Sequence, residues 1–246
     1  MGSTDADIDK VMAQCSGCKR EWFVVEQPQH TVTLDAFWID KTEVTNAMYA
    51  KCVADGKCEK PQYRSSNTRR FCYDYYMYTD YPVIYVGWNQ ANTYCQWAGR
   101  RLLTEAEWEK AARGMDGRTY PWGEQPQMGN LSNFCDENCE FDWKDSSVND
   151  GYEDTALVGS YPQGASVYGA LDMAGNVVEW VADWYSGTYY NGSTYENPQG
   201  PASGEYPVER DGSWYNGSSI LRSSNCGWYF PDYGGYFNGF RCARSP

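Results

Sequence analysis

Residues 212–243 have the sequence GSWYNGSSILRSSNCGWYFPDYGGYFNGFRCA, and this stretch says most about the chain. From Trp214 to Gly239, 20 of 26 residues are Gly, Tyr, Ser, Asn, Phe or Trp, and none is Lys, Glu, Gln or Met. Tyr supplies a large contact area for little lost rotamer entropy, while Ser, Gly and Asn adapt their hydrogen bonding, so this composition is typical of a binding loop. The flanks, 212–214 and 239–244, are typical of framework. An ordinary glycine-rich loop packed on a core is the plain alternative.

The bulk properties indicate a folded, acidic protein. The 246 residues suffice for one large domain or two small ones, and hydrophobic (41%) and aromatic (17%) contents disfavour disorder. A net charge of −13 argues against nucleic acid and anionic membranes as partners. No apolar run approaches the roughly 18 residues of a membrane span, and residues 1–7 lack the features of a signal peptide.

The ten cysteines favour an oxidising compartment. Six of them form close local pairs in the sequence, as disulfides of small loops do: Cys15/Cys18, Cys52/Cys58 and Cys135/Cys139. We therefore expect an extracytoplasmic protein, secreted or displayed on the cell surface. Zinc at Cys15 and Cys18 is a minor alternative, because a zinc site usually needs two such pairs.

Local patterns predict one compact α+β domain over residues 31–246, preceded by a polar leader segment, residues 1–30. Residues 31–40 predict a strand, and residues 44–54 and 89–98 predict helices. Thr104 and Glu107 form a capping box that opens a third helix, which runs to Arg113. Beyond residue 115 frequent turn signals predict short strands within ordered loops.

Six motifs then occur in a familiar order. They are FWIDKTEVTN (37–46), PVIYVGW (82–88), WAGRRLLTEAEWE (97–109), YPWG (120–123), DMAGNVVEW (172–180) and GFRCA (239–243). Together they resemble the sulfatase-modifying-factor family, whose best-known member is formylglycine-generating enzyme. The resemblance implies a C-type lectin fold of the formylglycine-generating-enzyme type, with little regular secondary structure.

The resemblance breaks where the family's oxidases need their metal. Those members hold copper through two cysteines, at positions occupied here by Asn216 and Leu221. Thiolates are the soft ligands that select Cu(I), and neither an amide nor an alkyl group replaces them. A second, iron-dependent branch uses several histidines, whereas this chain has only His30. We therefore expect no enzymatic activity and no catalytic cofactor, with a formylglycine-generating-type oxidase as the weaker alternative.

The C-terminal segment also resembles that of the variable proteins of diversity-generating retroelements, which share this fold. There, adenine-directed mutagenesis of Asn codons yields residues such as Tyr, Ser, Gly, Asp, Cys, Phe or Ile, but not Trp, Lys, Glu, Gln or Met. The segment follows this rule. The positions that we expect to vary are Tyr215, Asn216, Gly217, Ser219, Ile220, Cys226, Gly227, Tyr229, Phe230, Tyr233, Gly235, Tyr236 and Phe237.

These features predict a receptor-like protein that binds a ligand through a hypervariable face at about residues 212–241. The ligand is expected to be a protein or a glycan, with no nucleic-acid partner. The alternative is a family member of fixed sequence that serves as a partner-binding module.

Calcium ligands and disulfides are also implied by the resemblance. One calcium set comprises Asp172, the carbonyls of Gly175 and Val177, and Glu179; the other comprises Asn133, the Phe134 carbonyl, Asp150 and the Tyr152 carbonyl. Any calcium bound there would be structural. Cys95 and Cys242 match a family disulfide. The family's second disulfide would join Cys226 to position 112, which is Ala here, so Cys226 is expected to be free or paired with Cys72.

Overall fold

The computed structural model describes residues 1–15, 17–126, 129–192 and 195–246, and within them the helices follow the sequence patterns closely. In the α4 capping box the Thr104 hydroxyl accepts from the Glu107 amide (3.2 Å) and the Glu107 carboxylate accepts from the Thr104 amide (2.9 Å), as predicted. Thr45 is the N-cap of α2, and this helix therefore begins two residues later than predicted. The helices are α1 (Asp5–Gln14), α2 (Asn46–Ala54), α3 (Trp88–Trp97) and α4 (Glu105–Arg113).

The strands are short and form two sheets. In the first, β7 (Cys242–Arg244) lies between β1 (Trp38–Ile39) and β2 (Arg101–Leu102), antiparallel to both. The predicted strand at 31–40 is reduced to β1, because only Trp38 and Ile39 pair with β7. The second sheet has the order β5 (Cys226–Trp228), β4 (Pro207–Arg210), β3 (Val178–Trp184), β6 (Asn238–Gly239), with β6 parallel to β3.

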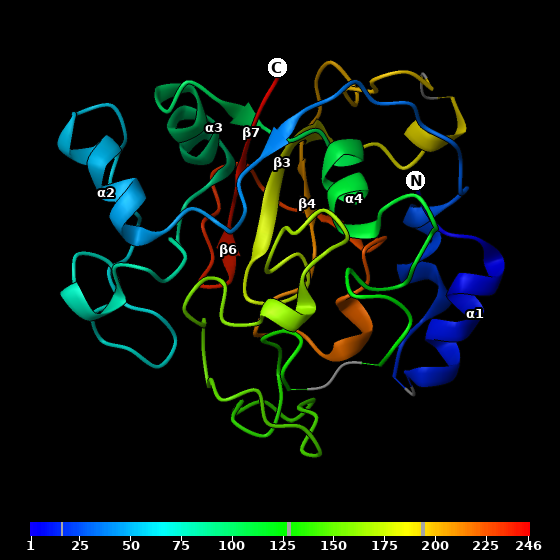
Figure 1. Cartoon of the computed structure of the whole chain (residues 1–246), viewed down its shortest axis with the longest axis horizontal. Coiled ribbons are helices and arrows are strands. Elements are labelled where there is room, and N and C mark those ends of the chain that lie inside the picture. The colour runs from blue at the N-terminus through cyan, green and yellow to red at the C-terminus, as the bar shows by residue number, and fades with distance from the viewer. Residues whose placement is uncertain (16, 127–128, 193–194) are drawn as a thin grey trace.

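Single 3-10 turns and long loops make up much of the rest. The turns are Arg20–Trp22, Val24–Glu26, Tyr76–Tyr78, Pro162–Gly164, Tyr189–Asn191 and Ser218–Ile220. Figure 1 shows the strands in the centre, with α2 and α3 on one side and α4 and α1 on the other. No helix in the described part of the chain is long and apolar enough to cross a bilayer.

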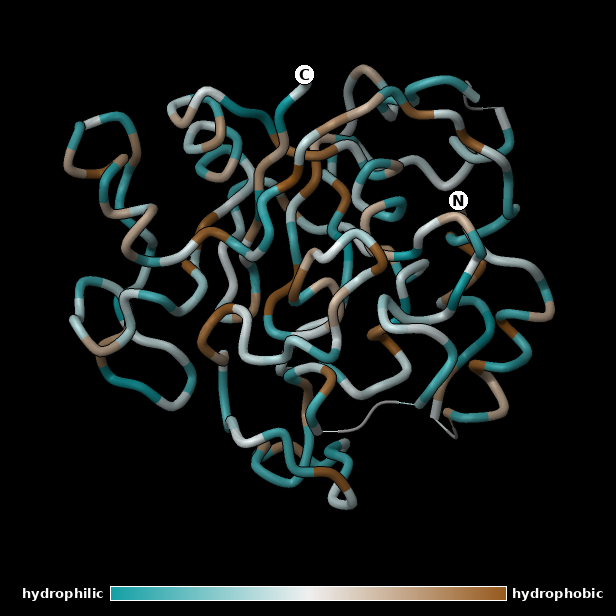
Figure 2. Tube along the Cα trace, viewed as in Figure 1, coloured by the Kyte–Doolittle hydropathy of each residue, from teal (hydrophilic) through white to brown (hydrophobic). Residues whose placement is uncertain are grey.

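The core lies on both faces of β3, where hydrophobic stretches converge (Figure 2). Trp180 packs with Tyr49, Tyr94 and Phe240, whereas Val181 on the opposite face packs with a second cluster that includes Trp108. A strand buried on both faces cannot carry the alternating pattern of a surface strand, which is why local patterns did not predict β3.

The described residues of the N-terminal segment, 1–15 and 17–30, are folded onto the domain. Ile8 and Val11 of α1 pack against Phe23, and the Gly2 amide donates to the Glu109 carboxylate of α4 (2.9 Å). The carboxylate of Glu26 is buried and accepts from both terminal nitrogens of Arg222, at 2.6 and 2.8 Å. The sequence left open whether this segment folds, and the structure shows that it does.

The described residues contain four disulfides. Three of them join the close local pairs Cys15–Cys18, Cys52–Cys58 and Cys135–Cys139, and the fourth is Cys95–Cys242. Cys95–Cys242 ties α3 to β7. Cys72 and Cys226 are both free, so of the two states left open for Cys226 the unpaired one is found.

Candidate ligand-binding face

The aromatic residues of the C-terminal segment gather into two ring groups. Tyr229 lies 4.4 Å from Tyr233 and 5.7 Å from Phe230 between ring centroids. Tyr215 stacks on Phe237 at 5.6 Å and meets Tyr236 edge-on at 5.7 Å. All six aromatic residues that we expected to vary therefore lie in one of two groups, each of three rings.

The rings of this segment are open to solvent to different degrees. Phe230 is 55% exposed and Tyr229 39%, whereas Tyr215, Tyr236 and Phe237 are half-buried. Trp214, expected to be scaffold, is buried, and so are Leu221 and Arg222. Trp228 is 37% exposed and stacks on Tyr185 at 3.8 Å.

Other loops complete this surface. Phe141 and Trp143 contact Tyr215 edge-on, at 4.7 and 5.0 Å. Tyr85 lies 6.5 Å from Tyr236, and Tyr206 lies 5.1 Å from Phe230. The sequence analysis missed these residues, because they lie up to 151 residues away along the chain. The run Phe141-Asp-Trp143, with aromatics in a polar stretch, was the available signal.

The glycines of the segment differ in the space around them. A side chain at Gly217 or Gly227 would meet nothing within 4 Å of its Cβ. At Gly235 the Cβ would lie 2.5 Å from Asn238 Oδ1 and 2.8 Å from the Tyr233 ring. Two of the three glycines expected to vary thus have room for a side chain, and the third requires Tyr233 and Asn238 to move.

Ser219 and Ile220 lie against the N-terminal segment. Ile220 packs on the cluster of Ile8, Val11 and Phe23, and Ser219 Oγ is 3.8 Å from Cys18 Sγ. These two positions are therefore half-buried by contact with residues 8–23.

The two positions that correspond to the copper cysteines of the oxidases have structural contacts. The side-chain oxygen of Asn216 accepts hydrogen bonds from the amide and hydroxyl of Ser213, at 2.9 and 2.8 Å. Leu221 is fully buried and packs with Tyr120, Phe134 and Ala174. Cys226 lies on β5, and burial raises the pKa of its thiol well above the usual value.

A framework of buried ion pairs underlies the ring groups. Arg241 donates to both carboxylate oxygens of Glu179 at 2.7–2.9 Å. Arg210 on β4 binds Glu109 at 2.9 Å and Glu105 at 3.2 Å. Each arginine therefore has a carboxylate partner within the core.

One buried acid in this region has no cationic partner among the contacts found. Burial raises the pKa of Glu209 to about 8, and a hydrogen bond from Asn238 Nδ2 opposes part of that rise. Glu209 lies on β4 and pairs in register with Gly227 of β5.

The two residue sets expected to hold calcium fit that ion unequally. In the first, both oxygens of Glu179 already accept from the Arg241 guanidinium, which supplies the positive charge, so this set does not fit. In the second, Asn133 Oδ1 is buried with no hydrogen-bond partner, and Asp150 accepts from the amides of Phe134 and Tyr152 at 2.9 Å. A buried side-chain oxygen without a partner and a buried carboxylate are ligand types that fit calcium.

Comparisons with known sequences cover nearly the whole chain. The family described as "Sulfatase-modifying factor enzyme 1-like domain" matches residues 5–246. A Streptomyces coelicolor protein named formylglycine-generating enzyme is 36% identical over 89% of this chain and 81% of its own length. A Mycolicibacterium smegmatis hercynine oxygenase is 32% identical over 89% of this chain and 55% of its own. A Chlamydia pneumoniae protein named serine/threonine-protein kinase pkn1 is 35% identical, but this chain spans only 35% of it.

Solved structures confirm the predicted α+β fold of the formylglycine-generating-enzyme and C-type lectin kind. PvdO from Pseudomonas aeruginosa superposes with a TM-score of 0.72 at 27% identity, over 90% of this chain and 85% of that one. Treponema denticola variable protein 1 superposes with a TM-score of 0.67 at 23% identity, over 91% and 89%.

The comparisons also overturn one prediction. We expected no enzyme because Asn216 and Leu221 replace the copper cysteines, yet the relatives that match most of this chain carry the names of enzymes. The prediction was wrong because the loss of one set of metal ligands removes one chemistry, whereas a fold can carry several.

Proposed function

This chain belongs to the sulfatase-modifying factor enzyme 1-like family, and from that premise we propose that it is a ligand-binding protein whose C-terminal segment, residues 212–241, forms a binding face of variable sequence. One observation carries this proposal: the six aromatic side chains at 215, 229, 230, 233, 236 and 237 gather into two ring groups that are exposed or half-buried. Clustered aromatic side chains are the usual anchors of binding sites.

Variation of the segment is supported by its composition and by its surroundings. The segment lacks Lys, Glu, Gln and Met, and Gly217 and Gly227 leave open space for larger residues. The protein named variable protein 1 from Treponema denticola has the same fold. Deep sequencing of the 3′ end of the gene, in a population grown from one clone, tests this part. Substitutions confined to codons 215–237 are expected; a 3′ end no more variable than the rest would leave a module of fixed sequence.

Binding by the ring groups needs a separate test. A random-peptide phage library and a glycan array would be screened with the wild-type protein and with a triple variant, Tyr229→Ser, Phe230→Ser and Tyr236→Ser. We expect the variant to lose the wild-type hits. The control variant carries Trp22→Ser, Tyr168→Ser and Tyr195→Ser, three rings exposed by 53%, 54% and 68% outside the segment. Equal retention of hits by both variants would disprove the binding role.

A structural calcium ion is proposed for the second residue set only. Asn133 Oδ1, Asp150 and the carbonyls of Phe134 and Tyr152 would hold it and clamp loops that have few regular hydrogen bonds. The proposal predicts a higher melting temperature in calcium than in EDTA, and loss of that difference in Asn133→Ala. Identical melting curves in the two buffers would count against it.

The location follows from the disulfides. Four disulfides indicate an oxidising compartment, outside the cytoplasm. We propose secretion or display on the cell surface, where a variable face can meet its ligand. Protease accessibility on intact cells, compared with the culture medium, separates the two sites.

A second candidate function is an oxidase activity of the kind for which the Streptomyces relative is named, favoured by the 36% identity over 89% of the chain. Its test is the formation of an aldehyde from a cysteine-containing peptide in the presence of copper and oxygen. Aldehyde formation that depends on the protein would support this candidate, and its absence in buffer that contains copper and oxygen would count against it.

A further inference from the structure

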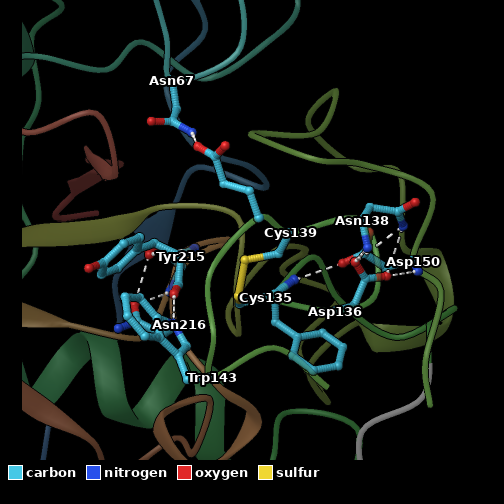
Figure 3. Close-up of a disulfide and its surroundings, with 12 residues drawn as sticks. Asn67, Cys135, Asp136, Asn138, Cys139, Trp143, Asp150, Tyr215 and Asn216 are labelled. Carbon is cyan, nitrogen blue, oxygen red and sulfur yellow. Dashed lines mark hydrogen bonds between the residues drawn. A yellow bond between two sulfur atoms is a disulfide. The ribbon is translucent and has the colours of Figure 1, made fainter. Parts of the chain in front are cut away.

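The loop that follows Cys135 is fastened to the proposed binding face. The Cys135 amide donates to the carbonyl of Asn216 (2.9 Å), and Trp143 Nε1 donates to the carbonyl of Tyr215 (2.9 Å) (Figure 3). The Cys135–Cys139 disulfide closes the intervening turn. Two consecutive carbonyls of the C-terminal segment thus hold the loop in one position.

This attachment places two further rings beside the variable ones. Phe141 and Trp143 are stacked, with centroids 4.9 Å apart and planes inclined by 7°, and Tyr215 meets both edge-on. Tyr215 in turn stacks on Phe237. We call Phe141, Trp143, Tyr215 and Phe237 the ring cluster. Trp143 is 50% exposed, a large amount for an indole whose nitrogen already has a partner.

The charge around the ring cluster is negative. Residues 135–154 contain eight acids and a single base, Lys144; Asp136, Asp150 and Asp154 are buried, and the other five acids are exposed or half-buried. Glu140 and Asp142 are exposed, and they directly precede Phe141 and Trp143, respectively, in the sequence.

On the facing 59–81 loop, the exposed guanidiniums of Arg64 and Arg70 lie over the ring of Phe71, at 5.9 and 5.3 Å from its centroid. Asn67 of that loop donates to Glu140 (3.0 Å).

Exposed aromatic rings with adjacent carboxylates are complementary to a cation with an apolar stem. A guanidinium or ammonium group over a ring face is attracted by the ring quadrupole, and nearby carboxylates add to that attraction. Resting on the binding role proposed above, we propose that the ring cluster is the part of the face that binds Arg or Lys side chains of a polypeptide partner. Trp143 is its fixed anchor, because it lies outside the segment proposed to vary.

The test uses peptides selected on the intact, oxidised protein. A random-peptide phage library is selected at 0.15 M NaCl, and the tightest peptide is synthesised with a fluorescent label. We expect the selected peptides to be enriched in Arg and Lys over the input library. By anisotropy, Trp143→Ala should weaken binding of the peptide about 5- to 30-fold. Asp142→Asn should weaken it less, and Trp22→Ala, an exposed indole elsewhere, should not change it.

Controls separate a lost anchor from a lost fold. Trp143→Phe keeps a ring but removes the hydrogen bond to Tyr215, so most of the affinity should return. Replacing the basic residues of the peptide by Gln should abolish binding to the wild type.

Three results would overturn this inference. Peptides that need Tyr229, Phe230 or Tyr236 but carry no excess of Arg or Lys would refute it while leaving the binding role intact. Hits on neutral glycans alone would likewise refute the inference that the ring cluster binds Arg or Lys side chains, and would leave the binding role intact. Binding unaffected by every aromatic substitution, at 141–143 and at 215–237, would refute both proposals.

Discussion

The framework and the ring groups are interleaved within the same stretch, residues 212–243, yet they are built in opposite ways. The framework residues, such as Arg222 and Arg241, are buried, and each forms an ion pair with a residue at least 62 positions away in sequence. The face residues contact one another and the rings of neighbouring loops, and Gly217 and Gly227 border open space. Substitution should therefore be costly at the first kind of position and cheap at the second, although the two kinds alternate along the chain.

The largest expected difference lies between two disulfides. Cys95–Cys242 closes a separation of 147 residues in the framework, whereas Cys135–Cys139 closes one of 4 beside the ring cluster. In the chain-entropy model, replacing both cysteines by Ala should cost about 5 kcal/mol in the first case and about 2 kcal/mol in the second. Urea denaturation of the two double variants measures both values. Equal losses in the free energy of unfolding would contradict the chain-entropy model, in which the disulfide that closes the longer loop stabilises more.

Arg241→Met should destabilise the protein by about 3–5 kcal/mol, because Glu179 would keep a buried charge without its partner. Arg244→Met, three residues further on and exposed, is the matched control and should change the free energy of unfolding by less than about 0.5 kcal/mol. Denaturant titration compares them. Similar denaturation midpoints for the two variants would show that the buried ion pair stabilises the fold no more than an exposed arginine does.

Two glycines of the segment provide a finer comparison. A Cβ at Gly234 would lie 2.5 Å from the carbonyl carbon of Tyr85, whereas one at Gly227 meets nothing within 4 Å. Gly234→Ser should therefore cost about 1–3 kcal/mol and Gly227→Ser less than about 0.5 kcal/mol. Thermal unfolding of both variants decides this. A destabilised Gly227→Ser would contradict the idea that the face tolerates change.

One expected difference depends on pH. Because burial raises the pKa of Glu209 to about 8, the folded state keeps a proton that the unfolded state releases near its ordinary pKa of 4.5. Stability should therefore fall as the pH rises from about 4.5 to 8 and level off above that. Glu209→Gln removes this slope and should be more stable than the wild type at pH 9.

The control for that titration is Glu205→Gln, an exposed acid four residues earlier. Its stability should follow the wild-type pH dependence. If Glu209→Gln retained the wild-type slope, another group would be responsible for it.

Much of the fold was predictable because its signals are local. The capping box at Thr104 and Glu107, and the ordered motifs, specify helices and family without reference to tertiary contacts. Strand β3 and the strand at 38–39 were harder, because burial on both faces or pairing with β7 decides them.

The candidate face was predicted in composition but not in extent. Tyr215 and Phe237 could be named from the sequence, whereas Phe141 and Trp143 join them through ring contacts of a distant loop, which hydrogen bonds from Cys135 and Trp143 attach to the carbonyls of residues 216 and 215. Likewise, no local pattern pairs Glu26 with Arg222, so the packing of residues 1–30 against Ile220 was not foreseen. Contacts between distant segments are what single-sequence reasoning lacks.

The position of β7 has a consequence for how such a chain is made. Residues 242–244 form the middle strand of their sheet and carry the cysteine that reaches Cys95, so the sheet cannot close until the ribosome has added them. A frameshift or stop codon arising within codons 215–237 removes this strand together with Arg241. If the segment varies as proposed above, truncated products would therefore fail to fold, and biosynthesis would separate usable variants from defective ones.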